Sequence, residues 1–299
     1  MQIKQTRREF LATLAAASAA CAIPTCASAK DHIQYGYTAI TWGGNDLQAI
    51  EDIAAAGYRG IQLRVNAVTE FKPEELKDLL ARHKLDFVAL SGGGPSLDVS
   101  EEDDIAAQMV NAKFLRDAGG KYLQLIDKNT VYQRVVTPDE CRRLGERLTA
   151  IGKRTADIGI PIGYHNHLTS ISERPENLDL VLAASDPKYV KLELDTAHYV
   201  AGGGDPAKAI LKYHDRILFM HLKDVVDLPP GAKARYPFLF VELGQGRVDI
   251  PAVYKALKQV HYSGWIVVEL DRVPDPAKTP KECAIISRDY LRQKIGVQI

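Results

Sequence analysis

Residues 160–167 read IPIGYHNH, an apolar run whose last residues are polar. The run is short, rich in isoleucine and without helical spacing, so it predicts a buried β-strand. Two imidazole groups, those of His165 and His167, then stand at the carboxyl end of that strand. A buried strand that ends in histidines is the pattern from which the rest of the chain is interpreted.

Seven further runs of β-branched or apolar residues occur along the chain, separated by polar loops and by segments with helical periodicity. They cover residues 33–40, 59–64, 87–92, 121–127, 190–195, 217–223 and 265–270. Alternating strands and helices predict a parallel sheet, and eight such units in about 270 residues match an α/β fold of the (β/α)8 TIM barrel type. A doubly wound sheet has fewer strands and usually a glycine fingerprint. No linker divides residues 30–299, so we expect one barrel domain there.

The composition is that of an ordinary globular protein. Of the 299 residues, 46% are hydrophobic and 25% are charged, which allows a sizeable core. Lysine plus arginine and aspartate plus glutamate both total 38, so the formal net charge is zero. Without a basic stripe, the sequence favours a small-molecule partner over nucleic acid or an anionic membrane. It leaves open whether the chain forms homo-oligomers.

The first 29 residues predict a separate export signal. A basic start with Arg7-Arg8, a short alanine-rich segment and small residues at 27–29 resemble a cleavable twin-arginine signal. An amphipathic N-terminal helix is the alternative, because the apolar segment is shorter than the roughly 20 residues that span a bilayer. We therefore expect cleavage after Ala29 and a periplasmic protein without a stable membrane anchor.

The predicted mature chain keeps two cysteines, Cys141 and Cys283, which are too few for a disulfide scaffold. Neither belongs to a CxxC or zinc-ribbon spacing. We expect both to be helix residues, although an oxidising compartment would also allow them to pair.

Polar side chains finish each of the last four predicted strands. In a TIM barrel the chemistry collects at the carboxyl ends of the strands, and alternation along each strand decides which side chains face the lumen. The lumen-facing side chains come in pairs: Glu193 with Asp195, His221 with Lys223, and Glu269 with Asp271. One ligand from each strand would surround a divalent metal ion, namely His165, Asp195, His221 and Glu269.

A single histidine on an apolar strand is more often a hydrogen-bonded structural residue than a metal ligand. Four ligand-type side chains at corresponding positions change that balance, because uncompensated charge at a barrel mouth is costly and a cation offsets it. Mixed nitrogen and oxygen ligands permit Mn²⁺, Co²⁺ or Zn²⁺, and also iron or nickel.

From about Ile33 to its end, the chain resembles the sugar phosphate isomerase/epimerase family, which has a xylose isomerase-like TIM barrel and includes inosose dehydratases. The stretches that carry the resemblance are GYHNH (163–167), LELDTAHYVAGGGDP (192–206), ILFMHLKD (217–224), LGQGRVDI (243–250) and HYSGWIVVELD (261–271). The resemblance implies that the four candidate ligands occupy the family's metal-binding positions. It also implies that His198 and Lys223 occupy substrate-contacting positions near the ion, and we expect them to orient substrate or to do acid-base work, with Glu269 also placed for proton transfer.

One position departs from the family's pattern. Many sugar epimerases of the family carry a carboxylate where this chain has His165, and that carboxylate and the last-strand glutamate act as two proton-transfer groups. A neutral imidazole bound to a metal is a poor base. The histidine resembles the dehydratase-like branch, and a two-base epimerisation would need His198, Lys223 or His167 as the second group.

The sequence thus predicts a divalent-metal-dependent isomerase or epimerase that acts on a keto-sugar or a cyclitol. Abstraction of an α-proton would give an enediolate that the metal stabilises. Two alternatives stay open. One is a lyase or dehydratase that acts on a keto-sugar, a keto-glycoside or an inosose. The other is a periplasmic carbohydrate-binding protein without catalysis.

Four further residues are candidates for substrate contacts, namely His167, Trp42, Gln62 and Gln124. Trp42 would stack on a sugar face, and packing in the core is an equal alternative. The two glutamines would bind hydroxyl groups or complete a layer of the barrel core. His167 faces the lumen if its strand continues, and otherwise it supports the site from outside the metal ligands.

Overall fold

The computed structural model describes residues 32–131, 134–232, 234 and 236–299. Ile33–Ile299 form one compact unit. The predicted signal segment, residues 1–29, lies outside the described residues, so the export signal and its cleavage stay predictions.

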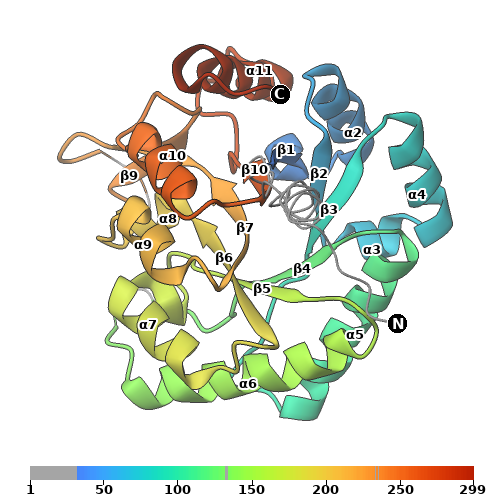
Figure 1. Ribbon diagram of the computed structural model, residues 1–299, viewed down its shortest axis with the longest axis vertical. Coiled ribbons are helices and arrows are strands. Elements are labelled where there is room, and N and C mark those ends of the chain that lie inside the picture. Colours follow the sequence, from blue (N-terminus) through green and yellow to red (C-terminus); the bar gives the residue numbers. More distant parts are fainter. Residues whose placement is uncertain (1–31, 132–133, 233, 235) are drawn as a thin grey trace, which may run out of the picture. The chain divides into compact units, whose positions relative to one another are not determined.

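Eight parallel strands close into a barrel, in the order β1-β10-β7-β6-β5-β4-β3-β2 (Figure 1). They are β1 Ile33–Thr38, β2 Gly60–Arg64, β3 Asp86–Ser91, β4 Tyr122–Leu125, β5 Ile162–His165, β6 Val190–Asp195, β7 Ile217–Leu222 and β10 Gly264–Val268. Each coincides with a predicted run to within two residues at either end. The (β/α)8 barrel predicted from the sequence is therefore confirmed.

Helices form a ring outside the strands (Figure 1). They are α2 Asp46–Ala55, α3 Ala67–Glu70, α4 Pro73–Arg82, α5 Glu101–Asp117, α6 Pro138–Ala156, α7 Pro175–Ala184, α8 Thr196–Ala201, α9 Pro206–Tyr213, α10 Ile250–Gln259 and α11 Pro280–Tyr290, with short turns η1 Ala39–Trp42, η2 Ile171–Glu173 and η3 Leu291–Ile295. Several begin with proline after a capping side chain, which fixes where each helix leaves its loop. Because each of these helices begins at a fixed residue, the loop that connects the preceding strand to it has a defined end.

Apolar side chains fill the barrel below those ends. Phe219 is completely buried and belongs to a cluster with Val88, Ala89, Trp265 and Val267. Phe219 and His221 are alternate residues of β7, so they share a face of the strand and the phenyl ring lies one layer below the imidazole. The polar residues at the strand ends therefore rest on a packed apolar floor.

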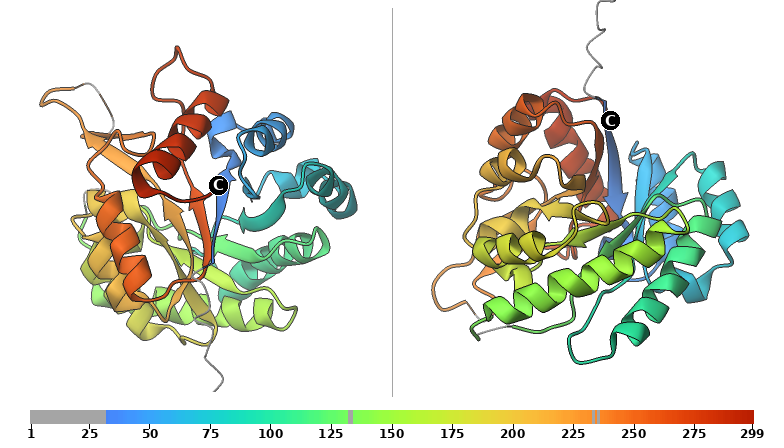
Figure 2. Two further views of the ribbon diagram at one scale, coloured as in Figure 1. Left: turned by 45° about the horizontal axis from the view of Figure 1, so that its top comes forward. Right: turned by 60° about the horizontal axis from the view of Figure 1, so that its bottom comes forward.

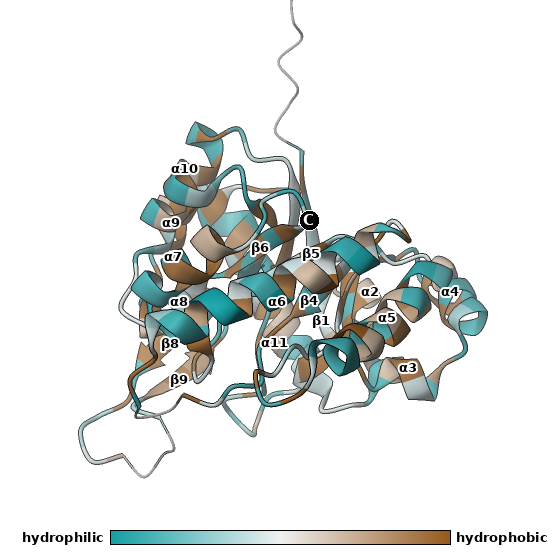
Figure 3. Cartoon of the chain, turned by 90° about the horizontal axis from the view of Figure 1, so that it is seen from below, coloured by the Kyte–Doolittle hydropathy of each residue, from teal (hydrophilic) through white to brown (hydrophobic). Residues whose placement is uncertain are grey.

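The connection from β7 to α10 contains a hairpin that the sequence patterns did not indicate. Its strands are β8 Asp224–Asp227 and β9 Phe238–Val241, which pair antiparallel with each other as a separate two-stranded sheet. The hairpin, orange in the left view of Figure 2, extends away from the barrel, and Figure 3 shows apolar residues along β9. The hairpin is part of a loop that follows a barrel strand, and such loops at the carboxyl ends of the strands build the active sites of TIM barrels.

One buried carboxylate holds the base of the hairpin. The two oxygens of Asp224 accept hydrogen bonds from the backbone N–H groups of Val225, Gly244, Gly246 and Val248, at 2.9 to 3.0 Å. Asp224 is completely buried, so no water replaces these bonds. The carboxylate thus joins the hairpin to the loop that leads into α10.

An Asp224→Ala variant is expected to lose about 1–3 kcal/mol of unfolding free energy, because buried N–H groups would be left without acceptors. Asp227→Ala is the matched control on the same strand, since the side chain of Asp227 is exposed and forms an ion pair with Arg247 at the surface. The control should change stability by less than about 0.5 kcal/mol. Urea unfolding of both variants measures the difference, and equal stabilities would contradict the role given to Asp224.

Both cysteines lie in helices, as expected: Cys141 in α6 and Cys283 in α11, each buried and free. Among the residues that the structure describes, no helix has the length and apolar character needed to cross a membrane.

Candidate metal centre and active site

The four predicted metal ligands lie together at the carboxyl end of the barrel, and all are buried. They are His165, Asp195, His221 and Glu269. Register brings them there, because Asp195 lies opposite His221 across the β6–β7 pair, while His165 lies opposite Glu193 across β5–β6. The expectation that successive strands end in one cluster is thus met by the geometry.

Two side chains brace the strand ends that carry the cluster. The amide of Asn166 both donates to the backbone oxygen of Asp195 at 3.1 Å and accepts from its N–H at 2.9 Å. The hydroxyl of Thr196 donates to the backbone oxygen of Lys223 at 2.7 Å and accepts from its N–H at 2.9 Å. These bonds continue the sheet by one step after the regular pairing stops, so the ligands sit on rigid backbone.

The nitrogen Nδ1 of His221 is the centre of the cluster. It lies 3.1 Å from Glu193 Oε1, 3.3 Å from Glu269 Oε2 and 3.7 Å from Asp195 Oδ2. The second carboxylate oxygen of Glu193, Oε2, lies 2.7 Å from Nδ1 of His165. Glu193 was predicted to face the lumen but was not among the predicted ligands, and it contacts both histidines.

Four atoms of this cluster are buried without a hydrogen-bond partner, namely His165 Nδ1, Glu193 Oε1, Asp195 Oδ2 and His221 Nδ1. Buried polar atoms in proteins are normally satisfied, so a convergent set of them calls for an explanation. Every one is a lone-pair donor of the kind that binds a divalent cation. The residues therefore fit a metal ion, because the ligand atoms of His165, Glu193 and His221 lie within 4.8 Å of one another, as do those of Asp195, His221 and Glu269.

Gln62 and Gln124 orient ligands of this cluster. Gln62 Oε1 lies 2.9 Å from Nε2 of His221, so it accepts the proton there and leaves Nδ1 free for a cation. The amide nitrogen of Gln124 donates to Glu193 Oε2, while its oxygen accepts from the hydroxyl of Ser91. The sequence left open whether the two glutamines bind hydroxyl groups or complete a layer of the core, and in the structure their side chains bond residues of the site, so hydroxyl binding stays a prediction.

A Gln62→Leu variant is expected to bind Mn²⁺ about 10–100-fold more weakly, because His221 would lose the partner that fixes its ring and tautomer. Gln48→Leu, on the exposed face of α2, is the matched control and should bind Mn²⁺ like the wild type. Calorimetric titration with Mn²⁺ gives both affinities. If the Gln62 variant bound Mn²⁺ with unchanged affinity, Gln62 would have no role in supporting the metal site.

Lys223 lies beside the cluster, fully buried, with its ammonium group between carboxylates. Nζ donates to Glu269 Oε1 at 2.9 Å and to Asp271, and it lies 3.2 Å from Nε2 of His198. The ring of Phe240, from β9, covers Nζ at 4.0 Å and meets His198 edge-on at 4.9 Å. Phe240 belongs to the unpredicted hairpin, so sequence patterns gave no signal for it.

The charges of the site set the protonation of its members. Burial alone would lower the pKa of His221, but the carboxylates of Glu193 and Glu269 outweigh it and raise the pKa well above the ordinary value. Burial would raise the pKa of the Glu269 carboxyl, but the positive charges of His221 and Lys223 hold that pKa well below its ordinary value. A cluster this rich in carboxylates attracts positive charge, which is consistent with cation binding.

Two further histidines continue the cluster outward. Burial and neighbouring positive charge lower the pKa of His198 well below its usual value, so its imidazole is neutral. The ring of His167 lies 4.0 Å from that of His198 and 5.5 Å from that of His165. β5 ends at His165, yet His167 stays beside the site, half-buried.

Trp42 lies in η1, buried among core residues. Its ring meets Tyr37 edge-on at 5.8 Å, and its indole N–H donates to Asp52 at 3.0 Å. These contacts match the core-packing alternative, and a sugar-stacking role for Trp42 stays a prediction.

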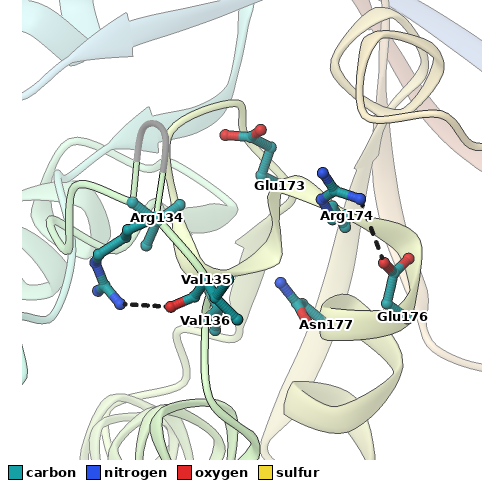
Figure 4. Close-up of a pocket in the computed structure, with 8 residues that line it drawn as sticks. Arg134, Val135, Val136, Glu173, Arg174, Glu176 and Asn177 are labelled. Carbon is teal, nitrogen blue, oxygen red and sulfur yellow. Dashed lines mark hydrogen bonds and ion pairs between the residues drawn. The ribbon is translucent and has the colours of Figure 1, made fainter.

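A separate cavity of about 660 Å³ opens between Val131 and residues 134–136 on one side and residues 173–177, at the start of α7, on the other (Figure 4). Its charged side chains pair with one another or with near neighbours. Arg134 pairs with Glu140 at 2.8 Å, and Arg174 pairs with Glu176 at 3.9 Å. None of the predicted site residues lines it.

Fold and site together define a (β/α)8 barrel with a His and carboxylate cluster suited to a metal ion. A model of the xylose isomerase-like TIM barrel family matches residues 50–293, and the chain belongs to that family.

Relatives and solved structures agree with this placement. The chain is 28% identical to an inosose dehydratase of Lacticaseibacillus casei (strain BL23), over 90% of this chain and 98% of the relative. It resembles the structure of an IolI protein with a bound zinc atom, with TM-score 0.71, 19% identity, and coverage of 88% and 98%. A probable 3-DHS dehydratase, AsbF of Bacillus anthracis, has TM-score 0.70 and 16% identity, over 87% of this chain and 99% of that one. At such identities the structural matches show the fold.

Proposed function

We propose that this protein is a divalent-metal-dependent enzyme that removes an α-proton from a keto-sugar or a cyclitol. The observation that carries the proposal is the convergence of buried ligand atoms without hydrogen-bond partners at the carboxyl end of the barrel. The similarity to inosose dehydratases over most of the chain supports a small polyhydroxylated substrate.

The cluster would hold one divalent ion through His165, Glu193, Asp195, His221 and Glu269. Imidazole and carboxylate donors suit Mn²⁺, Co²⁺ or Zn²⁺, and the zinc atom in the IolI structure supports a metal in this fold. When bound, such an ion polarises a substrate carbonyl and stabilises the negative charge that builds up beside it.

Glu269 is the residue to which we give the role of base. Its Oε2 faces the cluster at 3.3 Å from His221 Nδ1, while Oε1 accepts from Lys223. The carboxylate takes the proton from the carbon next to the carbonyl, and the electron pair of that C–H bond moves towards the carbonyl oxygen. Lys223 and His198, in contact with each other, orient substrate oxygens, and the ammonium group of Lys223 supplies a proton.

Dehydration is the outcome that we favour. A hydroxyl group on the next carbon takes a proton from the ammonium group of Lys223 and leaves as water, which needs one base and one acid. Position 165 holds a histidine, whose Nδ1 faces Glu193 within the ligand cluster. This position therefore supplies no carboxylate that could act as a second base. The names of the relatives support the same choice.

Isomerisation or epimerisation, the first prediction from the sequence, is the second candidate. It shares the proton abstraction and differs in returning a proton to carbon in place of losing water. The contact between Lys223 and His198 favours it, because this pair offers a proton donor beside Glu269.

A mass-spectrometric assay separates these outcomes. Protein loaded with Mn²⁺ is incubated in D₂O with a panel of keto-sugars and inososes. A loss of 18 Da supports dehydration, whereas deuterium uptake without loss supports isomerisation or epimerisation. No change with any substrate contradicts the proposal and favours the carbohydrate-binding alternative. Glu74→Gln, on exposed α4, is a control that should behave like the wild type.

We further propose that the protein is exported to the periplasm through its Arg7-Arg8 signal. The support is the sequence pattern alone. Fractionation of bacteria that express the chain tests this, with an Arg7→Lys, Arg8→Lys double variant as the comparison. Wild-type chain that stays in the cytoplasm would contradict the proposal.

A further inference from the structure

We infer that the groove beside the β8–β9 hairpin binds a second ring of the substrate, so that the enzyme takes glycosides in which the reacting sugar carries another ring. The inference rests on the proposed function, because it needs a sugar at the metal cluster. It adds a binding site that the cluster itself does not supply.

Three aromatic side chains at alternate positions form a row that starts at the site. Phe240 meets the ring of His198 at 4.9 Å. Phe238 follows at 5.5 Å from Phe240, and Tyr236 stacks on Phe238 at 5.4 Å with an interplanar angle of 10°. Alternate residues of a strand share a face, so Phe238 and Phe240 lie on one side of β9, and the ring of Tyr236, which precedes the strand, extends the row through its stacking on Phe238.

Two hollows follow this row. A small one of about 60 Å³ is lined by Tyr236, Phe238, Leu239, Phe240, Asp271 and Arg272. A larger one of about 400 Å³ shares Tyr236, Phe238, Leu239 and Arg272 with it and continues past Val273 and Pro274. Together they form what we call the aromatic groove, between β9 and residues 271–274, and its inner end is at Asp271, which contacts Lys223.

The base of the hairpin and Phe240 are held in place before any ligand arrives. Asp224 fixes its base through four backbone N–H groups, and the N–H of Arg247 donates to the backbone oxygen of Val225 at 2.8 Å. Phe240 is fixed at the other side by Lys223 and His198. Binding at the inner end of the aromatic groove, beside Phe240, therefore requires little ordering of the backbone, which favours affinity.

The lining favours a ring with apolar faces and polar edges. Aromatic side chains supply flat apolar surface, while Asp271 and Arg272 at the same groove supply one acceptor and several donors for hydroxyl groups. The inner end of the groove, at Asp271, contacts Lys223 beside the metal cluster, so a ligand anchored at the cluster reaches the groove through a bond from its reacting sugar. A glycosidic link to a sugar or an aryl ring meets both conditions.

Calorimetry with Mn²⁺-loaded protein tests the inference through three probes, namely the methyl, phenyl and glucosyl β-D-glucosides. We expect the phenyl or the glucosyl compound to bind about 10-fold more tightly than the methyl compound. Phe238→Ala should remove this difference and leave the methyl glucoside unchanged. Tyr189→Ala, a half-buried aromatic at the amino end of β6, is the matched control and should keep it. Circular dichroism verifies that each variant is folded, and Tyr236→Ala provides a second test of the groove.

The phenyl and glucosyl probes identify the second ring. Tighter binding of the phenyl compound alone indicates an aryl aglycone, and tighter binding of the glucosyl compound indicates a disaccharide. Equal or undetectable binding of all three compounds overturns the inference, as does a gain that survives in both groove variants. The proposed function is judged separately by mass. The protein could exchange a proton or remove water from single-ring substrates and yet bind two-ring compounds no more tightly. That result would support the proposed function and contradict only the binding of a second ring in the groove.

Discussion

A His221→Ala variant is expected to lose its metal ion and with it nearly all activity. Nδ1 of His221 lies within 3.7 Å of carboxylate oxygens from Glu193, Asp195 and Glu269, so its removal takes away the central donor and leaves those carboxylates facing one another. Loss of an outer partner of a ligand already costs about 10–100-fold in metal affinity, and loss of the ligand should cost more. Elemental analysis after dialysis against Mn²⁺ measures the bound metal directly.

A second measurement of the same variant does not depend on activity. Metal that binds only the folded wild type should stabilise it by about 2.7 kcal/mol at a metal concentration 100 times the dissociation constant. His221→Ala should show no such gain, whereas His214→Ala, on the exposed end of α9, should keep it. Full metal content and full stabilisation in the His221 variant would show that the cluster binds no ion through this residue.

The strand ends were predictable from the sequence because two local properties agree there. Apolar runs of four to eight residues mark buried strands, and period-two alternation places Asp195, His221 and Glu269 on the lumen side of theirs. In a closed parallel barrel all carboxyl ends meet at one face, so residues far apart in the chain become neighbours. Those rules need no knowledge of packing.

The ligand role open to Glu193 could not be found in that way. Alternation puts Glu193 and Asp195 on the same side of β6, but it does not say which of them reaches the neighbouring histidines. A shift in register between β6 and β7 decides this: Leu192 pairs with Ile217, and the next residue, Glu193, pairs with Phe219. The irregularity depends on how the strands pack, which a single sequence does not encode locally.

The hairpin escaped prediction for a different reason. β8 starts two residues after β7 ends, so the apolar pattern of Val225 and Val226 reads as a continuation of the preceding strand. β9 is short and follows a stretch with Pro229, Pro230 and Gly231 that indicates a loop. Pairing across such a loop is non-local, so the aromatic groove becomes visible only in three dimensions.

A Glu269→Gln variant is expected to keep its metal and lose catalysis. The amide keeps an oxygen close to His221 Nδ1 but cannot accept a proton from carbon, so the rate should fall about 10²–10⁴-fold. His165, Glu193, Asp195 and His221 remain to hold the ion. The measurement is the initial rate of water loss or deuterium uptake, together with the metal content of the same sample.

The matched control is Asp271→Asn, because both substitutions remove a carboxylate from Lys223 and only one of them alters the cluster. If the role of Glu269 were only to neutralise Lys223, the two variants would lose similar activity. If its role were only to bind the ion, the Glu269 variant would lose metal as completely as His221→Ala. A large loss of rate with metal retained, and a small loss in the Asp271 variant, is the combination that proton transfer requires, since it separates the chemistry of this carboxylate from its charge and from its ligation.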